Sequence, residues 1–292
     1  MRSRPYRAGD LPRMLGFLTG RRAADPAGDY EHVGDLQWRM RLLSEPERCL
    51  RLWEDGRTLV GYAARDGGAL VVQVDRARAE AGTLAEEMLD WALAAAPGEP
   101  AEAYAHEGDA GRIGLLERLG FARDDLWFVE LWRRLDEPLP GPEVPPRFVV
   151  RAFAGAPEVE AYVAMHRDAW SDRRPSSYTV EAHRRVMAMP GYERELNPVV
   201  VAPDGVLVAS CVCWLDRRNR TAEIEPLGTR PAFRRRGLGR ALVLEALRRM
   251  RAHGATRALV YGVSGNEPAR RLYLSTGFVP KRRVLVYRRI SP

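Results

Sequence analysis

The stretch Thr221 to Arg240, TAEIEPLGTRPAFRRRGLGR, joins two kinds of secondary structure through a glycine-rich turn. We interpret Thr221 to Thr229 as a strand. After the turn, apolar residues recur with the 3.6-residue period of a helix. These residues are Leu238, Ala241, Leu242, Leu247 and Met250. The stretch is therefore predicted to lead a strand into a helix N-terminus, and Gly254 is predicted to end that helix.

The turn between strand and helix is suited to an anion. Backbone N–H groups at a helix N-terminus lack intrahelical acceptors, and the helix dipole favours negative charge there. Gly237 and Gly239 let a ligand approach the backbone without a Cβ in the way. Four arginines add positive charge: Arg234, Arg235, Arg236 and Arg240. A pyrophosphate would fit this turn, although the pattern R-x-x-G-x-G taken alone favours an ordinary structural turn.

The residues that follow give the turn its context. A further strand is predicted at Ala258 to Val263, and it leads to Asn266 to Phe278, NEPARRLYLSTGF. With Thr229 to Phe233 leading into the turn, this succession resembles the GNAT superfamily of N-acetyltransferases. The resemblance is specific over Thr221 to Phe278 and looser over the rest of Arg147 to Pro292.

The resemblance implies that acetyl-CoA is the cosubstrate and that no metal is needed. It places the CoA pyrophosphate on the arginine-flanked turn and the pantetheine arm along the preceding strand. A backbone N–H near Leu227 would polarise the thioester carbonyl. The implied cofactor contacts are Leu227, Gly228, Thr229, Arg234, Arg235, Arg236, Gly237, Leu238, Gly239, Arg240, Asn266 and Ala269. Asn266 is equally compatible with a plain helix cap.

Three residues are candidates for proton transfer. Tyr273 takes the position of the family's general acid, which protonates the departing thiolate, and its alternative is packing against the sheet. Glu223 and Glu225 are candidate bases for the acceptor amine. Because they are spaced by two on a strand, they are expected to share one face with Leu227 and Thr229. Solvated strand positions, or an anchor for a cationic substrate, remain open for both.

Other side chains give weaker signals. The segment Ser171 to Thr179 is expected to shape the acceptor pocket. The histidines have no partner by spacing and are expected in surface or core roles; they are His32, His106, His166, His183 and His253.

The chain divides at a segment that contains five prolines, residues 137–146. We predict a Pro-rich linker there, a first GNAT-like domain at 1–136 and a catalytic domain at 147–292. Both halves are expected to be α/β, with a mixed central sheet flanked by helices. Gly82 and Gly120 are 38 positions apart and Gly237 and Gly277 are 40 apart, which suggests a duplication.

The first half lacks the residues that carry the chemistry. Aligned on Gly82 and Gly120, it has Leu84 for the second glycine of the turn, Leu116 for Tyr273 and Asp109 for Asn266. Asp75 and Glu80 oppose an anionic ligand. We expect this half to keep the fold without catalysis, and to complete the sheet or wall the acceptor cleft.

Composition indicates a soluble globular protein. No apolar run approaches the length of a membrane span, and we expect a cytoplasmic monomer or homodimer. The net charge of +7 comes from arginines spread along the whole chain, so no nucleic-acid or membrane partner is expected. The predicted function is acetyl-CoA-dependent N-acetylation of a primary amine of a small molecule or peptide, by direct attack in a ternary complex. The alternative is a non-catalytic acetyl-CoA-binding or regulatory module.

Overall fold

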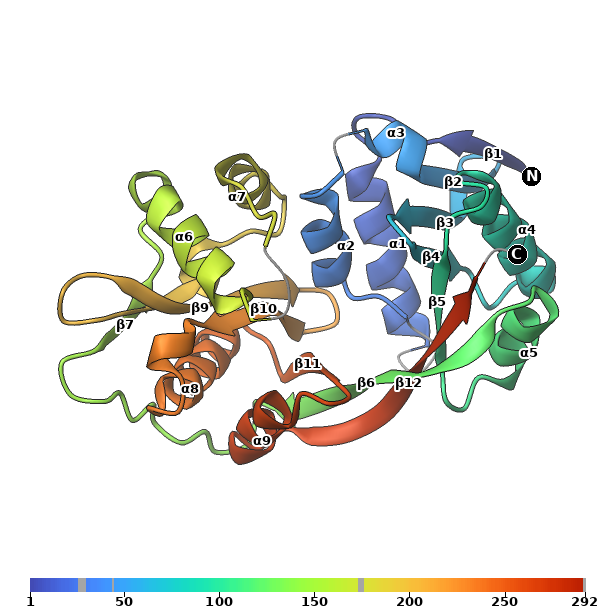
Figure 1. Cartoon of the computed structure of the whole chain (residues 1–292). Coiled ribbons are helices and arrows are strands. Elements are labelled where there is room, and N and C mark those ends of the chain that lie inside the picture. The colour runs from blue at the N-terminus through green and yellow to red at the C-terminus, as the bar shows by residue number, and fades with distance from the viewer. Residues whose placement is uncertain (26–29, 44, 173–175, 291–292) are drawn as a thin grey trace.

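The computed structural model describes residues 1–25, 30–43, 45–172 and 176–290. It has the mixed α/β class expected from the sequence (Figure 1). The strands of the first half are β1 (Arg2–Pro5), β2 (Leu50–Asp55), β3 (Thr58–Asp66), β4 (Ala69–Val74), β5 (Ala101–His106) and β6 (Ala122–Arg134). Its helices are α1 (Leu11–Ala24), α2 (Val33–Met40), α3 (Pro46–Cys49), α4 (Ala81–Ala94) and α5 (Ala110–Arg118).

The second half repeats this order of elements. Its strands are β7 (Val149–Ala152), β8 (Pro198–Val201), β9 (Leu207–Asp216), β10 (Thr221–Thr229), β11 (Arg257–Val263) and β12 (Val279–Arg289). Its helices are α6 (Val159–Ala169), α7 (Val180–Met187), α8 (Leu238–Ala252) and α9 (Glu267–Ser275). The predicted strand, turn and helix of Thr221 to Arg240 are confirmed: β10 ends at Thr229, and α8 begins at Leu238 and buries its apolar stripe.

The twelve strands in the described part of the chain form one sheet, and the two halves exchange their last strands. The order is β1-β2-β3-β4-β5-β12-β6-β11-β10-β9-β8-β7. The last strand of the second half, β12, pairs with β5, from Val284 opposite His106 to Arg289 opposite Ala101. The last strand of the first half, β6, pairs with β11. In Figure 1 these two long strands run side by side beneath both lobes.

This exchange has a physical consequence. A separated half would lose the strand that its partner supplies and would expose the backbone of β5 or β11 as an unpaired edge. Residues 1–136 and 147–292 are therefore interlocked through the sheet, and experiments on this protein require the whole chain.

β5 and β6 were not expected from the sequence. β5 reads AEAYAH, whose alanines have little strand preference, and β6 reads ARDDLWFVELWRR, which mixes charged and aromatic side chains. Both strands are specified by pairing with β12 and β11, and the sequence of one strand does not show which distant strand it pairs with.

Helix α2 of the first half reaches into the second half. It packs against β9 and β10 (Figure 1). Its Trp38 belongs to the same buried cluster as Tyr178 and Trp214 of the second half. The face of β10 that carries Glu223 is thus covered partly by a helix from the other repeat.

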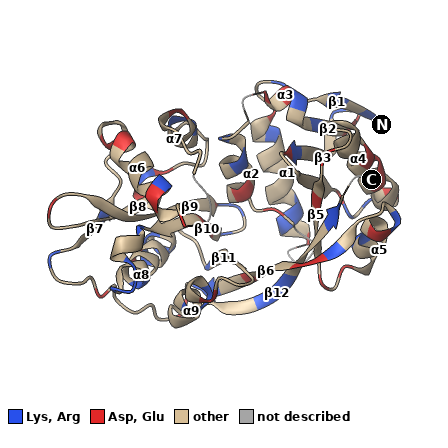
Figure 2. Ribbon diagram, in the orientation of Figure 1, with Lys and Arg blue, Asp and Glu red and all other residues tan. Residues whose placement is uncertain are grey.

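Charged side chains are interspersed over both halves (Figure 2). Within the described ranges, no helix has the length and apolar character needed to cross a membrane.

Candidate active site

The parallel pair β10 and β11 separates partway along its length. Pairing is recorded from Thr221 opposite Arg257 to Glu223 opposite Leu259. On its other side, the pairing of β10 with β9 jumps from Ile224–Cys213 to Leu227–Cys211. This bulge adds a residue to β10 and bends it. Among the described strands, none pairs with the β11-facing edge of β10 beyond Glu223, so that edge can bind an extended ligand.

The bulge corrects one expectation from the sequence. Strict alternation would place Leu227 and Thr229 on the same face as Glu223. The extra residue inverts the alternation, and Leu227 packs instead in the cluster beneath α8, which also contains Ile224. On the opposite face, a Cβ added to Gly228 would collide with the Trp170 ring. Glu223 and Glu225 therefore do not share their face with Leu227 and Thr229.

The glycine turn after β10 leaves a helix N-terminus open. Gly237 has φ +80° and precedes α8, and no side chain caps the helix. The N–H groups of Leu238, Gly239 and Arg240 therefore lack intrahelical acceptors. A Cβ on Gly239 would lie 3.3 Å from Leu272 Cδ2 of α9, so glycine permits this close approach between α8 and α9.

The arginines around this turn differ in their contacts. The Arg234 guanidinium donates to Asp172 Oδ2 at 2.6 Å, to the Ala169 carbonyl at 2.8 Å and to the Thr229 carbonyl at 3.1 Å. It thus joins the turn to the end of α6. The Arg236 guanidinium carbon lies 5.3 Å from the centre of the Phe233 ring. Arg235 and Arg236 are exposed and lie beside the open N–H groups. Arg240 is half-buried, and its Nη1 lies 3.9 Å from Glu143 Oε2.

Asn266 lies just before α9, and Tyr273 lies on it. The side chain of Asn266 caps this helix by accepting from the Ala269 N–H at 3.3 Å, so the plain capping role is present. Tyr273 is buried and its ring packs edge-to-face on Phe278 at 5.9 Å between centres. Burial, and next the negative charge of Glu225, raise the pKa of Tyr273. The phenol therefore stays protonated at neutral pH and can donate.

Glu223 is enclosed by residues of the first half. Its side chain is fully buried, and Oε2 lies 3.2 Å from His32 Nδ1. Burial, followed by the charge of Glu225, raises the pKa of Glu223 to about 8. A Cβ added to Gly34 would collide with Glu223 Oε2, so only glycine fits at this contact.

Asp35 and Glu225 complete an acidic group around Glu223. The Asp35 carboxyl accepts from the His32 N–H at 2.8 Å, and burial and the charge of Glu223 raise its pKa. Burial and the charge of Asp35 raise the pKa of Glu225 to about 7. Glu225 is the less enclosed of the two glutamates, and its carbonyl accepts from Trp214 Nε1 at 2.7 Å. Acids shifted to near neutrality can exchange protons at working pH.

Sequence reasoning did not find the contribution of the first half. His32 was expected in a surface or core role, yet it contacts a candidate base. Spacing cannot reveal the pair, because 191 positions separate the two residues and the contact exists only once α2 packs on β10. Of the segment Ser171 to Thr179, residues 173–175 lie outside the described part of the chain, and Tyr178 is buried and contacts His183 Nδ1 through its hydroxyl at 2.9 Å.

The corresponding place in the first half is filled. β4 and β5 also separate after one recorded pair, Ala69 with Glu102. Arg112 bridges the gap, donating to the Tyr104 carbonyl at 2.6 Å and to the Val72 carbonyl at 3.2 Å. Its guanidinium carbon lies 4.4 Å from the centre of the Tyr30 ring.

The N-caps of α5 and α9 show which residues of the two halves correspond. Asp109 caps α5 by accepting from the Arg112 N–H, as Asn266 caps α9 by accepting from the Ala269 N–H. Arg112 therefore corresponds to Ala269, whose side chain is too short to bridge β10 and β11 in the same way.

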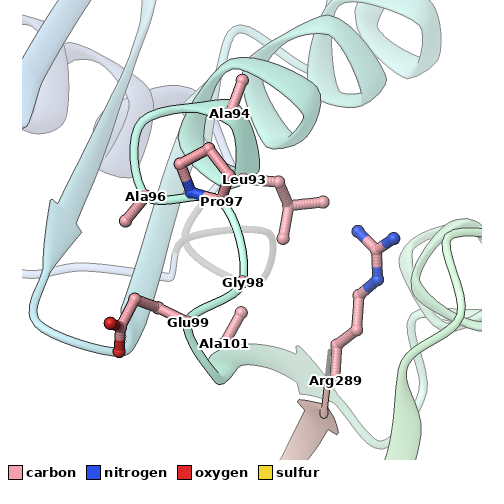
Figure 3. A pocket seen from close by; sticks show the side chains of 8 residues that line it. All are labelled: Leu93, Ala94, Ala96, Pro97, Gly98, Glu99, Ala101 and Arg289. Atoms are coloured by element: carbon pink, nitrogen blue, oxygen red, sulfur yellow. The ribbon is translucent and has the colours of Figure 1, made fainter. Parts of the chain in front are cut away.

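A surface hollow elsewhere offers no comparable chemistry. It has a volume of about 250 Å³, and alanine, glycine and proline side chains at the end of α4 make up most of its lining (Figure 3). Glu99 and Arg289 are its charged residues. Among the described residues, no group of three or more His, Cys, Asp or Glu side chains is placed to hold a metal ion.

The second half thus combines a splayed parallel strand pair, an uncapped glycine turn and buried acids at the splay, an arrangement suited to binding an extended anionic ligand beside groups that exchange protons. Comparison with known proteins agrees: residues 160–278 match the model of the acetyltransferase (GNAT) family. The chain belongs to this family of acetyltransferase enzymes, which use acetyl-CoA and acetylate amines.

Relatives match most of the chain. A mycothiol acetyltransferase of Beutenbergia cavernae is 34% identical over 239 residues, which cover 76% of this chain and 77% of the relative. One from Frankia alni is 30% identical, with 79% and 74% covered. A tandem GNAT protein from the clavulanic acid biosynthesis pathway has a similar fold over the whole chain and 99% of its own, with a TM-score of 0.70 at 16% identity.

Proposed function

We propose that the second half transfers an acetyl group from acetyl-CoA to the primary amine of a small molecule or peptide, by direct attack in a ternary complex. The observation that carries the proposal is the placement of Glu223 and Glu225, with raised pKa values, where β10 leaves β11. The open N-terminus of α8 follows on the same connection.

The cosubstrate would lie along β10 and end at α8. We assign its diphosphate to the N–H groups of Leu238, Gly239 and Arg240, with charge from Arg235 and Arg236. The residues of the β10 edge, Leu227 to Thr229, would bind the pantetheine arm, and the Leu227 N–H would stabilise negative charge on the thioester oxygen. Asn266 would orient α9, and the small Ala269 would leave room for the ligand.

The proton steps follow from the positions of the acids. An acceptor ammonium loses one proton to the Glu223 carboxylate, directly or through water, with Glu225 as the alternative acceptor. The amine nitrogen then forms a bond to the acetyl carbon, and the carbon–sulfur bond breaks. The Tyr273 hydroxyl protonates the departing thiolate and regains a proton from the reacting nitrogen through water. Glu223 releases its proton to solvent.

The first half, in this proposal, does not catalyse. Arg112 occupies the space that an acyl thioester needs, and Asp75 and Glu80 remain near the corresponding turn. Its contribution is α2, which covers the Glu223 face of β10.

The acceptor is best identified by a thiol-release screen of the whole chain with acetyl-CoA. The name of the relatives puts a cysteinyl-sugar amine of the mycothiol type first in the panel. Polyamines, aminoglycosides, amino acids and peptide N-termini complete it. Tight acetyl-CoA binding without thiol release for any amine would refute the proposal and favour the binding-module alternative.

Replacing Tyr273 with phenylalanine should lower kcat about 10- to 100-fold, because the thiolate loses its proton donor. The ring and its contact with Phe278 remain, so the dissociation constant of acetyl-CoA should change less than about twofold. Stopped-flow thiol release under single-turnover conditions measures the chemical step. An unchanged single-turnover rate would remove Tyr273 from the mechanism.

The whole chain should bind one acetyl-CoA. Gly237→Val places a β-branched residue at φ +80°, which should distort the turn and weaken acetyl-CoA binding more than about tenfold. Gly82→Val is the control in the first half, at the second residue of α4, where an added Cβ meets nothing within 4 Å. Isothermal titration gives stoichiometry and affinity for both. A stoichiometry of two, or a comparable loss in Gly82→Val, would place a cofactor in the first half.

A further inference from the structure

His32 lies at the contact between the two halves and precedes α2. Its side chain is fully buried, as is that of Glu223. Nδ1 lies 3.2 Å from Glu223 Oε2 and accepts from the Gly34 N–H at 3.2 Å, and Nε2 lies 3.2 Å from Thr221 Oγ1. Nε2 therefore has a hydrogen-bond partner on β10, and Nδ1 lies close to a carboxyl oxygen of the same strand, which carries the candidate bases.

We propose that His32 is a positioning residue of the acetyl transfer, through which the first half orients the Glu223 carboxyl and sets its strength as a base. The inference rests on the function proposed above.

The hydrogen bonds determine which nitrogen carries the proton. Because Nδ1 accepts from the Gly34 N–H, its lone pair faces Gly34 and Glu223, and Nε2–H donates to Thr221 Oγ1. Burial lowers the pKa of His32 well below its usual value, which keeps the ring neutral. A neutral Nδ1 is a hydrogen-bond acceptor, so it stabilises the protonated Glu223 carboxyl, which can donate, more than the carboxylate. Its carboxylate therefore takes a proton from an ammonium more readily.

Other charged groups act on the same carboxyl from each neighbouring element. The charged or titratable groups that interact electrostatically with Glu223 or His32 are Arg22 of α1, Glu31 before α2, Asp35 of α2, Asp216 of β9, Glu225 of β10, Tyr261 of β11 and Glu130 of β6. Of these, Glu225 and Glu31 raise the pKa of Glu223 through their negative charge, whereas the charge of Arg22 and a side-chain hydrogen bond with Asp35 lower it.

Three substitutions at position 32 separate this role from helix capping. His32→Gly removes Nδ1 and costs the cap only a few tenths of a kcal/mol. His32→Asn restores an acceptor oxygen near the place of Nδ1 and is a strong cap, and His32→Asp adds a negative charge there. We expect His32→Gly to lower kcat about tenfold and to move the acidic limb of the kcat/KM profile to lower pH. His32→Asn should recover most of the rate, and His32→Asp should move the limb to higher pH.

The test uses the whole chain and two readouts. The pH dependence of kcat/KM reports the reaction, and ¹³C NMR of carboxyl-labelled glutamate, assigned with Glu223→Gln, reports the titration of Glu223 without turnover. Matching shifts in both readouts support the proposal. A His32→Gly profile that superimposes on the wild type, or a His32→Asn variant as impaired as His32→Gly, overturns it. A wild type that releases no thiol refutes the proposed function instead, and the positioning role with it.

A second variant decides the matter where position 32 does not tolerate change. Thr221→Val removes the partner of Nε2–H and leaves the His32 side chain in place. The ring can then carry its proton on Nδ1 and donate to the carboxylate, giving up the bond that Nδ1 accepts from the Gly34 N–H, so the Glu223 titration should move to lower pH. A folded Thr221→Val protein with an unshifted titration overturns the proposal.

Discussion

Replacing Glu223 with glutamine is expected to lower kcat about 10²- to 10⁴-fold, the usual contribution of a general base. Glutamine keeps the shape of the side chain in its buried position but cannot take a proton from the acceptor. Because Glu223 lies where β10 and β11 are still paired, short of the predicted ligand-binding edge, acetyl-CoA should bind with nearly unchanged affinity. Thiol release and isothermal titration measure the two quantities.

If Glu223 is the base, its titration should also determine how kcat/KM of the wild type depends on pH. The base works as a carboxylate, and its pKa is raised from 4.5 to about 8. Between these values the folded protein holds Glu223 largely protonated, so kcat/KM should rise with pH up to about 8 and fall about tenfold per unit below it. The Glu223→Gln variant should lack this limb.

Glu225→Gln is the matched control. Glu225 titrates near 7 and is less enclosed, so its removal should lower the pKa of Glu223 by removing a like charge, and should cost less in kcat. If Glu225→Gln causes the larger loss and Glu223→Gln retains most of the rate, the roles of the two glutamates are reversed.

Local sequence predicted the second half well because its signals are local. The end of β10 at Thr229 and the start of α8 at Leu238 follow from strand propensity, glycine and helical period within one stretch of chain. The Asn266 cap follows from its place before a helix that begins with Glu267 and Pro268.

The features that were not predicted from the sequence depend on contacts between distant segments of the chain. The bulge at Glu225 and Pro226 moves the side chains that follow it to the other face of β10. A prediction that alternates faces at every residue cannot detect the inserted residue. The exchange of β6 and β12 requires knowledge of which strand edges meet in space. The same holds for His32 and Arg112, whose sequence neighbours give no sign that one faces a candidate base and the other fills a splayed pair.

Gly34→Ala should damage both stability and turnover, although Gly34 touches no predicted cofactor residue. Alanine in a helix is ordinarily favoured over glycine by about 1 kcal/mol. Here the added Cβ would collide with Glu223 Oε2 and lie 2.8 Å from Trp214 Cβ and Cδ1. Overpacking of this kind typically costs about 1 to 3 kcal/mol, so Gly34→Ala should lower the free energy of unfolding instead of raising it.

The same displacement should move the Glu223 carboxyl and open the contact between α2 and β10, and we expect kcat to fall at least about tenfold at unchanged acetyl-CoA affinity. Urea unfolding and thiol release test the two effects. Gly16→Ala in α1 is the control, because an added Cβ there meets nothing within 4 Å, and it should stabilise the protein. A Gly34→Ala protein as stable and active as Gly16→Ala would show that α2 does not press on Glu223, and the catalytic contribution assigned to the first half would fall with that contact.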